Sequence, residues 1–489
     1  MEYFQPTEAY NSFLQFVNLI ESDMPSYTID FLKKESNFSV DAKFKIVDNG
    51  NYVLSFSTKE SIPLKIFKNS LTILQSEWYN IVFDNIYTQQ IESTIYKSEK
   101  PNEFRITTKS FRSSSEDEWE SSNICAFYKY DHNVFNPDKS CIIGISHEPI
   151  IIKIKEFEII IYWGRRTSPK RTNKDERFLM FYSKTKTDLL TFKRLVEAIR
   201  VAWGIISGYY IGKNVYYLSF NPENGLAGIS FAYHNLQEEL VSYRGMIDSG
   251  NYDNISESDL RLTIYEFERL ASILYGNIVY LRTGQLLINA SNDEGLPKGG
   301  IAAIALEAIS GEIENQMENE RNKFKMPKEL TEEIQEIINR FKDNKKISEE
   351  QQEHYLKKLN GFSTPFNSDK LSKPFHSLGI KLTKTEEGII KNRNKILHGR
   401  LPEKVKGLDF AAKLKDDELI LYTSNKLIML CTMLLLKLAH IEKQINDWGV
   451  TIIVKKRLMK NGMYIGNGGI KHRQMSDIDP VDDSPEWLI

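Results

Sequence analysis

The sequence is poor in cysteine: Cys125, Cys141 and Cys431 are the only three in 489 residues, and no two form a C-x-x-C pair. So few scattered thiols exclude a disulfide framework and a structural zinc site, and they favour a reducing compartment. The sequence also lacks H-E-x-x-H, G-x-S-x-G and a G-x-x-x-x-G-K-[ST] loop. These absences argue against zinc proteolysis, serine hydrolysis and P-loop nucleotide hydrolysis. We therefore expect neither a metal nor another cofactor.

Excess charge and long hydrophobic runs are missing as well. The formal net charge is −2, so a charged partner has to be met by a local patch. The most apolar run, "LIMLCTMLLLKLAHI" at 427–441, is interrupted by Lys437 and is shorter than the ~20 apolar residues of a spanning helix. It predicts a buried helix. The opening "MEYFQPTEAYNSFLQF" has no basic segment followed by an apolar core, so no secretory signal is visible. We expect a cytoplasmic protein without membrane contact.

Two or three domains are expected for a chain of 489 residues. Residues 1–183 alternate apolar and polar positions with many β-branched side chains, as in "NYVLSFS" and "IIIKIKEFEIIIYW". This pattern predicts a β-rich N-terminal sensor or regulatory domain, built as a sandwich or a barrel-like sheet. The polar stretch "GRRTSPKRTNK" at 164–174 predicts a loop between two of its strands.

The pattern changes to helical periodicity after residue 184. Residues 184–257 predict a helical and mixed connecting segment, and 258–448 an all-α bundle. Residues 449–489 predict a hairpin, "TIIVKKRLMKNGMYI", with its turn at Asn461-Gly462, and then an acidic tail. The fold class expected is α+β, with a β-rich domain followed by a helical one.

One helix of the bundle ends in an unusual way, with "KNRNKILHGR" at 391–400. Thr383-x-x-Glu386 predicts its start as a capping box, and Gly399 predicts its end in a left-handed backbone. At 100° per residue, Arg393 falls in the middle of an apolar stripe. The stripe consists of Ile389, Ile390, Ile396 and Leu397. A guanidinium there must find a partner or face a second surface, because bare burial of the charge is too costly.

The residue types in Arg393-Asn394-x-x-x-His398 suit RNA cleavage through the ribose 2′-hydroxyl. Histidine titrates near neutral pH and serves as base or acid, and arginine offers a planar fork to phosphate oxygens. Two copies across a twofold axis would supply two of each group in one cleft. The structural alternative is that Arg393 pairs with a carboxylate such as Glu307 or Glu312, while His398 merely caps the helix.

The R-N-x-x-x-H pattern in a C-terminal helical bundle resembles the HEPN superfamily. The helix "IAAIALEAISGEIEN" at 301–315 is similar to the acidic helix that precedes the motif there. The β-rich half followed by "RLVEAIRVAWGIISGYYIG" is similar in arrangement to ApeA-type anti-phage proteins with an Apea-like HEPN domain.

This resemblance implies a metal-independent endoribonuclease that is dimeric through its helical domain. It also implies restraint until phage infection and then cleavage of host or phage RNA. Arg393 and His398 would be catalytic, Asn394 would support them, and Glu307 would orient Arg393. The sequence continues His398-Gly399-Arg400 and lacks the H-x-Y extension of HEPN toxins, which argues against control by tyrosine modification.

Two basic stretches are candidates for RNA binding, because basic side chains near a cleft bind phosphate without sequence choice. The first lies in the β half and includes Arg165, Arg166 and Arg171; the second follows the bundle and includes Lys455, Lys456, Arg457 and Lys460. The first stretch also fits a solvated loop or a contact with a phage-derived trigger. The expected partners are RNA, a second copy of the chain and such a trigger.

A second reading belongs to another functional class: a catalytically silent protein whose bundle dimerises and whose β domain binds a partner. A nucleic-acid-binding regulator is a third, disfavoured by the neutral charge and the missing helix-turn-helix and zinc finger. The presence of Arg393 and His398 together, with Asn394 between them, favours the enzyme.

Overall fold

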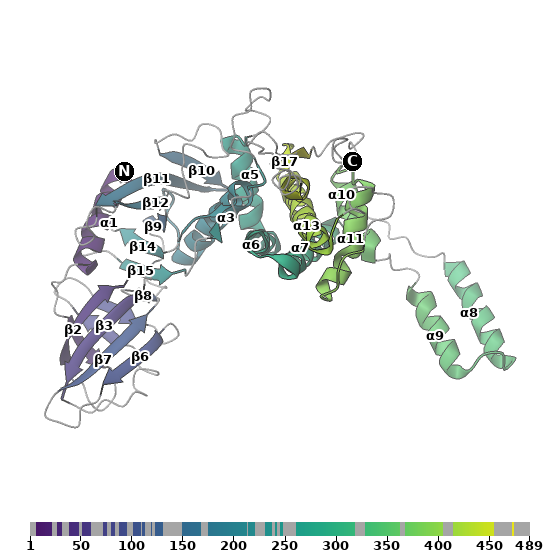
Figure 1. Ribbon diagram of the computed structural model, residues 1–489, viewed down its shortest axis with the longest axis horizontal. Helices are drawn as coiled ribbons and strands as arrows, with labels where there is room; N and C mark the ends of the chain where they lie inside the picture. The colour runs from purple at the N-terminus through teal and green to yellow at the C-terminus, as the bar shows by residue number, and fades with distance from the viewer. Residues whose placement is uncertain are drawn as a thin grey trace. The chain divides into compact units, whose positions relative to one another are not determined.

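The computed structural model describes residues 6–21, 27–31, 39–47, 51–59, 72–75, 80–83, 88–94, 101–108, 110–112, 119, 123–130, 149–167, 175–212, 214–220, 230–236, 240–241, 245–247, 261–317, 328–361, 367–403, 414–453 and 472–473. The chain divides into two compact units, Met1–Leu281 and Arg282–Ile489. A β-sheet region comes first and a helical region follows (Figure 1). The α+β class expected from the sequence is therefore confirmed.

One antiparallel sheet runs through the first unit. Its strands are β1 (Tyr27–Phe31), β2 (Ser39–Ile46), β3 (Tyr52–Thr58), β4 (Thr72–Gln75), β5 (Asn80–Phe83), β6 (Thr88–Thr94), β7 (Asn102–Thr108), β8 (Ser110–Arg112), β9 (Asn123–Tyr130), β10 (Ile150–Ile154), β11 (Phe157–Thr167), β12 (Asp175–Ser183), β14 (Asn214–Phe220) and β15 (Ser230–Asn235). Their order is β10-β11-β12-β9-β14-β15-β8-β5-β4-β1-β2-β3-β7-β6. Hydrogen bonds thus link these fourteen strands into one sheet.

Two features of this sheet differ from the sequence-based expectation. Strands β14 and β15 follow residue 183, yet they pair with β9 and β8 and so belong to the same sheet. Strand β11 continues through Thr167, into the stretch expected to be a loop from residue 164. Arg165 there pairs in register with Arg177, and Arg166 with Glu176. The sequence pattern missed this strand end because its side chains are polar. Backbone hydrogen bonds between strands form without apolar residues.

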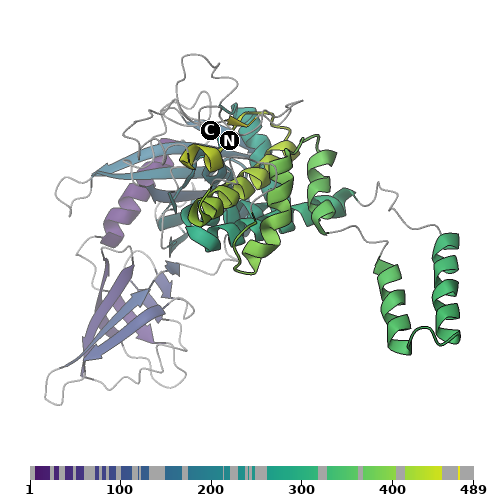
Figure 2. The same cartoon turned by 45° about the vertical axis from the view of Figure 1, so that its right-hand side comes forward.

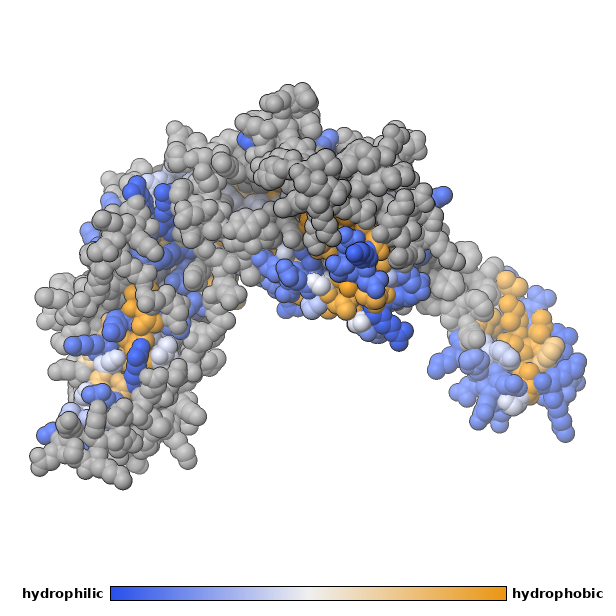
Figure 3. Space-filling view, in the orientation of Figure 1, coloured by the Kyte–Doolittle hydropathy of each residue, from blue (hydrophilic) through white to orange (hydrophobic). Residues whose placement is uncertain are grey.

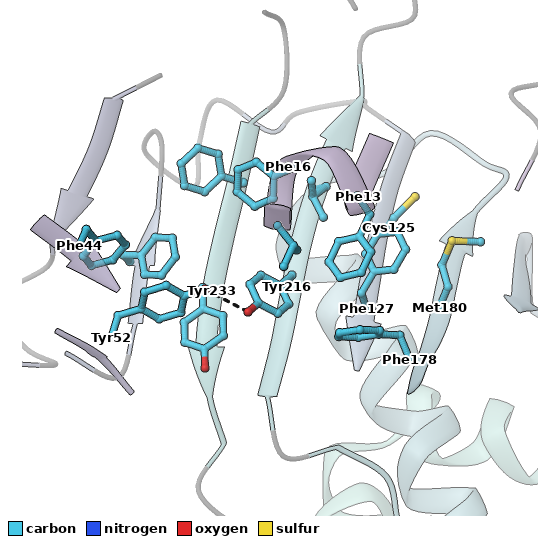
Figure 4. Close-up of a cluster of buried hydrophobic side chains, with 14 of the residues drawn as sticks. Phe13, Phe16, Phe44, Tyr52, Cys125, Phe127, Phe178, Met180, Tyr216 and Tyr233 are labelled. Atoms are coloured by element: carbon cyan, nitrogen blue, oxygen red, sulfur yellow. Dashed lines mark hydrogen bonds between the residues drawn. The ribbon is translucent and has the colours of Figure 1, made fainter. Parts of the chain in front are cut away.

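An N-terminal helix, α1 (Pro6–Glu21), packs its aromatic face on the sheet, and the sequence analysis missed it. The ring of Phe13 stacks on Phe127 at 3.9 Å between centroids, as Figure 4 shows. Gly164 in β11 leaves room for Tyr10, because a Cβ at Gly164 would lie 2.1 Å from the Tyr10 ring. Deeper in the same core, the hydroxyls of Tyr52 and Tyr216 are 3.1 Å apart (Figure 4).

Three further helices begin within the first unit: α3 (Leu189–Ser207), α5 (Ile264–Gly276) and α6 (Ile278–Asn292). Asp188 caps α3 by accepting a hydrogen bond from the Thr191 amide at 2.8 Å. Gly208 ends α3 with φ 74°, a conformation that glycine adopts without strain. Short strand pairs also occur: β13 (Tyr209–Tyr210) with β16 (Leu240–Val241), and β17 (Ile445–Asn446) with β18 (His472–Arg473).

The second unit is built around α7 (Gly295–Met317), which packs against α10 (Asn367–Ser377), α11 (Lys384–Leu397) and α13 (Asp416–Leu438). Figures 1 and 2 both show α7, α11 and α13 side by side. Helix α13 has the length and apolar composition of a membrane span, and 89% of its most apolar window is buried in the protein. The buried helix expected at 427–441 is confirmed as far as Leu438. Helices α8 (Lys328–Asp343) and α9 (Glu349–Gly361) pair with each other.

A buried ion pair holds the end of the described bundle. Lys426 Nζ in α13 lies 2.6 Å from Asp447 Oδ2, with both side chains almost fully buried. Asp447 also accepts a hydrogen bond from the Val450 amide at 3.2 Å, at the start of a helical turn over 448–453. The hairpin expected from Thr451 onward is therefore wrong for Thr451–Ile453, which are helical, and its remainder lies outside the described residues.

Gly299 of α7 lies against side chains of both α11 and α13 and has no room for a Cβ. A Cβ on Gly299 would lie 2.7 Å from Ser424 Oγ of α13 and 2.9 Å from Ile396 Cγ2 of α11. One residue further along α7, a Cβ on Gly300 would meet no atom within 4 Å in the described part of the chain. Glycine at 299 therefore sets the spacing of these three helices.

This spacing predicts opposite effects for two neighbouring substitutions. We expect Gly299→Ala to lower the free energy of unfolding by about 1–3 kcal/mol, because the methyl group overpacks the three-helix junction. Gly300→Ala should instead raise it by roughly 0.5–1 kcal/mol, because alanine favours an exposed helix. Urea unfolding monitored by circular dichroism checks both. Equal effects of the two substitutions would contradict the close approach at Gly299.

Candidate active site

Helix α11 begins and ends where the sequence predicts. The Glu386 amide donates to Thr383 Oγ1 at 3.0 Å, and the Thr383 amide donates to Glu386 Oε2 at 2.9 Å, which completes the capping box. At the other end Gly399 has φ 68°, and the Arg400 amide donates to the Lys395 carbonyl at 2.7 Å. These two termini fix which residues face the bundle.

Arg393 is buried among apolar residues, at 3% exposure, as its place in the stripe predicted. Its Nε donates to Glu307 Oε1 of α7 at 3.2 Å, and its Nη1 donates to the Ile390 carbonyl at 3.0 Å. Burial lowers the pKa of the Arg393 guanidinium, and Glu307 partly offsets that effect. The group remains charged at neutral pH, because arginine starts from so high a value.

The structure decides between the two carboxylates considered for Arg393. Glu307 is the partner, whereas Glu312 accepts a hydrogen bond from Gln316 at 2.9 Å on its own helix. The Glu307 side chain is 44% exposed, while that of Arg393 is 4% exposed. The ion pair therefore spans from the interior to the surface of the second unit. This contact fits both an orienting role for Glu307 and a structural ion pair.

Asn394 and His398 lie one helical turn apart and are both exposed. His398 occupies the C-cap, and its backbone amide donates to the Asn394 carbonyl at 3.1 Å. Within the described ranges, neither side chain has a hydrogen bond or an ion pair. The cap is thus made by the backbone of His398, which leaves the imidazole available to a ligand.

The surface of α7 around Glu307 carries few large side chains among the described residues. Gly300, Ile304, Glu307 and Gly311 recur every three or four residues and so share one face of the helix. Ile304 is 50% exposed, and a Cβ added at Gly300 or Gly311 would meet none of the described residues within 4 Å. An exposed isoleucine between two open glycines gives a second surface room to approach Glu307 closely.

The candidate RNA-binding residues are only partly described. Arg165 is exposed at the end of β11 in the first unit, and Arg166 follows it in the same strand. Arg171, Lys455, Lys456, Arg457 and Lys460 lie outside the described residues. The structure thus brings Arg393 and Glu307 together, with Asn394 and His398 on the same helix end. The basic stretches stay predictions.

The sequence analysis missed a second buried arginine, Arg200 of α3. Its guanidinium carbon lies 4.4 Å from the ring centre of Tyr128 and 4.2 Å from that of Tyr210. Arg200 Nη1 donates to Glu197 at 2.7 Å, and its Nε donates to the Ile211 carbonyl at 2.8 Å. Burial lowers the pKa of Arg200. Tyr210, Tyr128 and Glu197 together raise it by more than burial lowers it, so the net shift is upward. Glu197-x-x-Arg200 within an apolar helix was the available signal, and the cluster anchors α3 to β9 and β13.

No family model matches this chain, and neither a curated protein nor a solved structure gives a match. The resemblance to HEPN proteins therefore rests on the motif and its setting. Among the described residues, no three His, Cys, Asp or Glu side chains gather as metal ligands would.

The Arg393–Glu307 pair predicts a position-specific loss of stability. We expect Glu307→Gln to lower the free energy of unfolding by about 1 kcal/mol, since the buried guanidinium loses its counter-charge at a half-exposed partner. Glu312→Gln neutralises a carboxylate five residues along the same helix and should change it by less than about 0.5 kcal/mol. Urea unfolding of both variants checks this. Indistinguishable values would show that Glu307 does not compensate the Arg393 charge.

Proposed function

We propose that this protein is a metal-independent endoribonuclease of the HEPN type that acts in anti-phage defence in the cytoplasm. The observation that carries the proposal is the helix end of α11. It holds a buried, ion-paired Arg393 next to Asn394 and His398, which are exposed and have no side-chain partner in the described part of the chain. All three residue types of the motif thus lie together at one helix end, with the Asn394 amide and the His398 imidazole exposed to solvent.

The roles follow from the chemistry of each group. His398 takes the 2′ proton from the ribose or protonates the leaving 5′ oxygen, which are the tasks of a base and an acid near neutral pH. Arg393 stabilises the negative charge that develops on the phosphorane. A guanidinium has five N–H groups, and two of them are engaged by Glu307 and Ile390. The others remain to address phosphate oxygens.

Access to Arg393 depends on Glu307. Because Arg393 is 3% exposed, a phosphate reaches it only when a neighbouring group moves aside, and the proposal assigns this movement to the Glu307 carboxylate. Glu307 is 44% exposed at the side chain and so has space to move. In this proposal Glu307 orients and neutralises Arg393 while the enzyme is at rest, and the phosphate replaces it as the counter-charge in the working state.

One chain supplies one histidine and one arginine of this motif, whereas the reaction uses both a base and an acid. A homodimer across a twofold axis supplies the second set. This face of α7 supports the arrangement, since exposed Ile304 and Glu307 lie between Gly300 and Gly311, which leave room for a second helix within the described residues. In this proposal the N-terminal β region senses a phage-derived trigger or restrains the nuclease. The trigger then releases the nuclease activity.

The second candidate is a silent dimerisation protein that binds its partner through the β region. The Arg393–Glu307 pair favours it to the extent that both charges already satisfy each other. The two candidates differ in one measurable way, because only the enzyme needs the Arg393 and His398 side chains for an effect on RNA.

The test is cleavage of total host RNA by the purified full chain in EDTA, with and without lysate from infected cells. We expect cleavage that leaves 2′,3′-cyclic phosphate ends, and a loss of at least about 100-fold in Arg393→Ala and in His398→Ala. Lys391→Ala and His376→Ala are the controls, since the first removes an exposed cation from α11 and the second an exposed imidazole from α10. Both controls should cleave like the wild type.

Two results would contradict the proposal that this protein is a ribonuclease. Equal cleavage by the wild type and both motif variants would mean that another site or a contaminant acts. Cleavage by none of them, with and without infected lysate and with folded protein throughout, would favour the silent interaction protein.

A further inference from the structure

Helices α8 and α9 form a hairpin with two distinct sides. The row Thr331, Gln335, Ile338 and Lys342 is half-buried and faces α9. Lys342 Nζ lies 3.0 Å from Glu349 Oε1, and Gln352 Nε2 donates to Asn339 at 2.8 Å. These contacts fix how α8 is rotated about its own axis against α9.

The turn between the two helices is well defined. Lys345 has φ 54°, and its amide donates to the Lys342 carbonyl at 2.8 Å, which closes α8. The Gln351 amide donates to Ser348 Oγ at 3.2 Å, and the Ser348 amide donates to Gln351 Oε1 at 2.9 Å, which caps α9. The hairpin is therefore a defined element with a fixed outer side.

That outer side of α8 carries an apolar stripe. Leu330, Ile337 and Phe341 are 44%, 43% and 46% exposed, and Ile334 lies half-buried between them. The spacing of four, three and four residues is that of the a and d positions of a coiled coil. Figure 3 shows apolar surface along this hairpin. A continuous stripe of this kind on a helix predicts that another helix covers it.

Charge along the stripe indicates which helix this is. A row of charged residues borders the stripe on the side away from α9: Glu329, Glu333, Glu336 and Arg340. The first half of α8 is acidic, with Glu332 as a further carboxylate. The second half and the turn are basic on balance, because Arg340, Lys342, Lys345 and Lys346 outnumber Glu336 and Asp343. A second α8 running antiparallel would place the acidic half of each helix against the basic half of the other, whereas a parallel one would oppose like charges.

We propose that α8 is a self-association surface that pairs antiparallel with α8 of a second copy across a twofold axis. Leu330 then packs against Phe341 of the second copy, and Ile334 against its Ile337. Glu333 faces Arg340 of the second copy, and the twofold axis repeats this ion pair. Each hairpin contributes two helices, so the product is a four-helix bundle. This surface involves neither Arg393 nor His398 and does not depend on the proposed RNA cleavage.

Charge reversal tests the antiparallel order directly. Glu333→Arg places arginine against Arg340 in the pair, and Arg340→Glu places glutamate against Glu333. We expect each variant alone to lose one step of self-association, with about half the wild-type assembly mass by sedimentation velocity from about 1 to 100 µM. An equimolar mixture of the two variants should regain the wild-type mass, because the arginine introduced into one chain then meets the glutamate introduced into the other.

Glu332→Arg is the matched control, because it reverses the same charge one residue away on the opposite side of α8 and should leave the mass unchanged. The proposal fails if neither single variant changes the mass, which would leave the stripe to a different protein partner. It also fails if the control lowers the mass equally, or if the mixture stays dissociated. A dimer contact through α7 does not obscure the result. With both contacts present the wild type is a tetramer, and loss of the α8 contact leaves a dimer of half that mass.

Discussion

The ion pair between Arg393 and Glu307 is the constraint on which the helical unit and its candidate site depend. A guanidinium at 3% exposure is costly to bury, and the compensating carboxylate comes from another helix, 86 residues away in sequence. The pair is satisfied only while α7 and α11 keep their spacing, which Gly299 permits because it has no side chain where Ile396 of α11 packs against α7. Packing and charge compensation thus impose the same geometry on these two helices.

This geometry also determines what is left exposed. With Arg393 turned inward, Asn394 and the C-cap residue His398 project from the end of α11 into solvent. In the proposed function this pair is the resting state, in which Glu307 neutralises the Arg393 charge. A substrate phosphate would then take the place of the Glu307 carboxylate as the counter-charge.

The parts predicted from sequence are those controlled by local interactions. Thr383 and Glu386 predicted the start of α11, Gly399 its end, and helical periodicity placed Arg393 in the apolar stripe. The choice between Glu307 and Glu312 was not available from sequence, because the two lie on different faces of α7 and only its rotation in the bundle decides. Helix α1 was missed because its aromatic face is explained only by a sheet that forms later in the chain. The Arg200 cluster was missed for a similar reason, since Tyr128 approaches it from a distant strand.

The most direct test asks whether Arg393 serves chemistry or only packing. In the double variant Arg393→Met with Glu307→Gln, the buried pair is replaced by groups that need no counter-charge. Such replacements are often neutral for stability or stabilising by about 1–4 kcal/mol. The measurement is RNA cleavage in EDTA by this variant beside the wild type, after both are shown to be folded. Our account predicts cleavage by the wild type and none by the folded double variant. Equal cleavage by the two would contradict it and leave Arg393 as a structural residue.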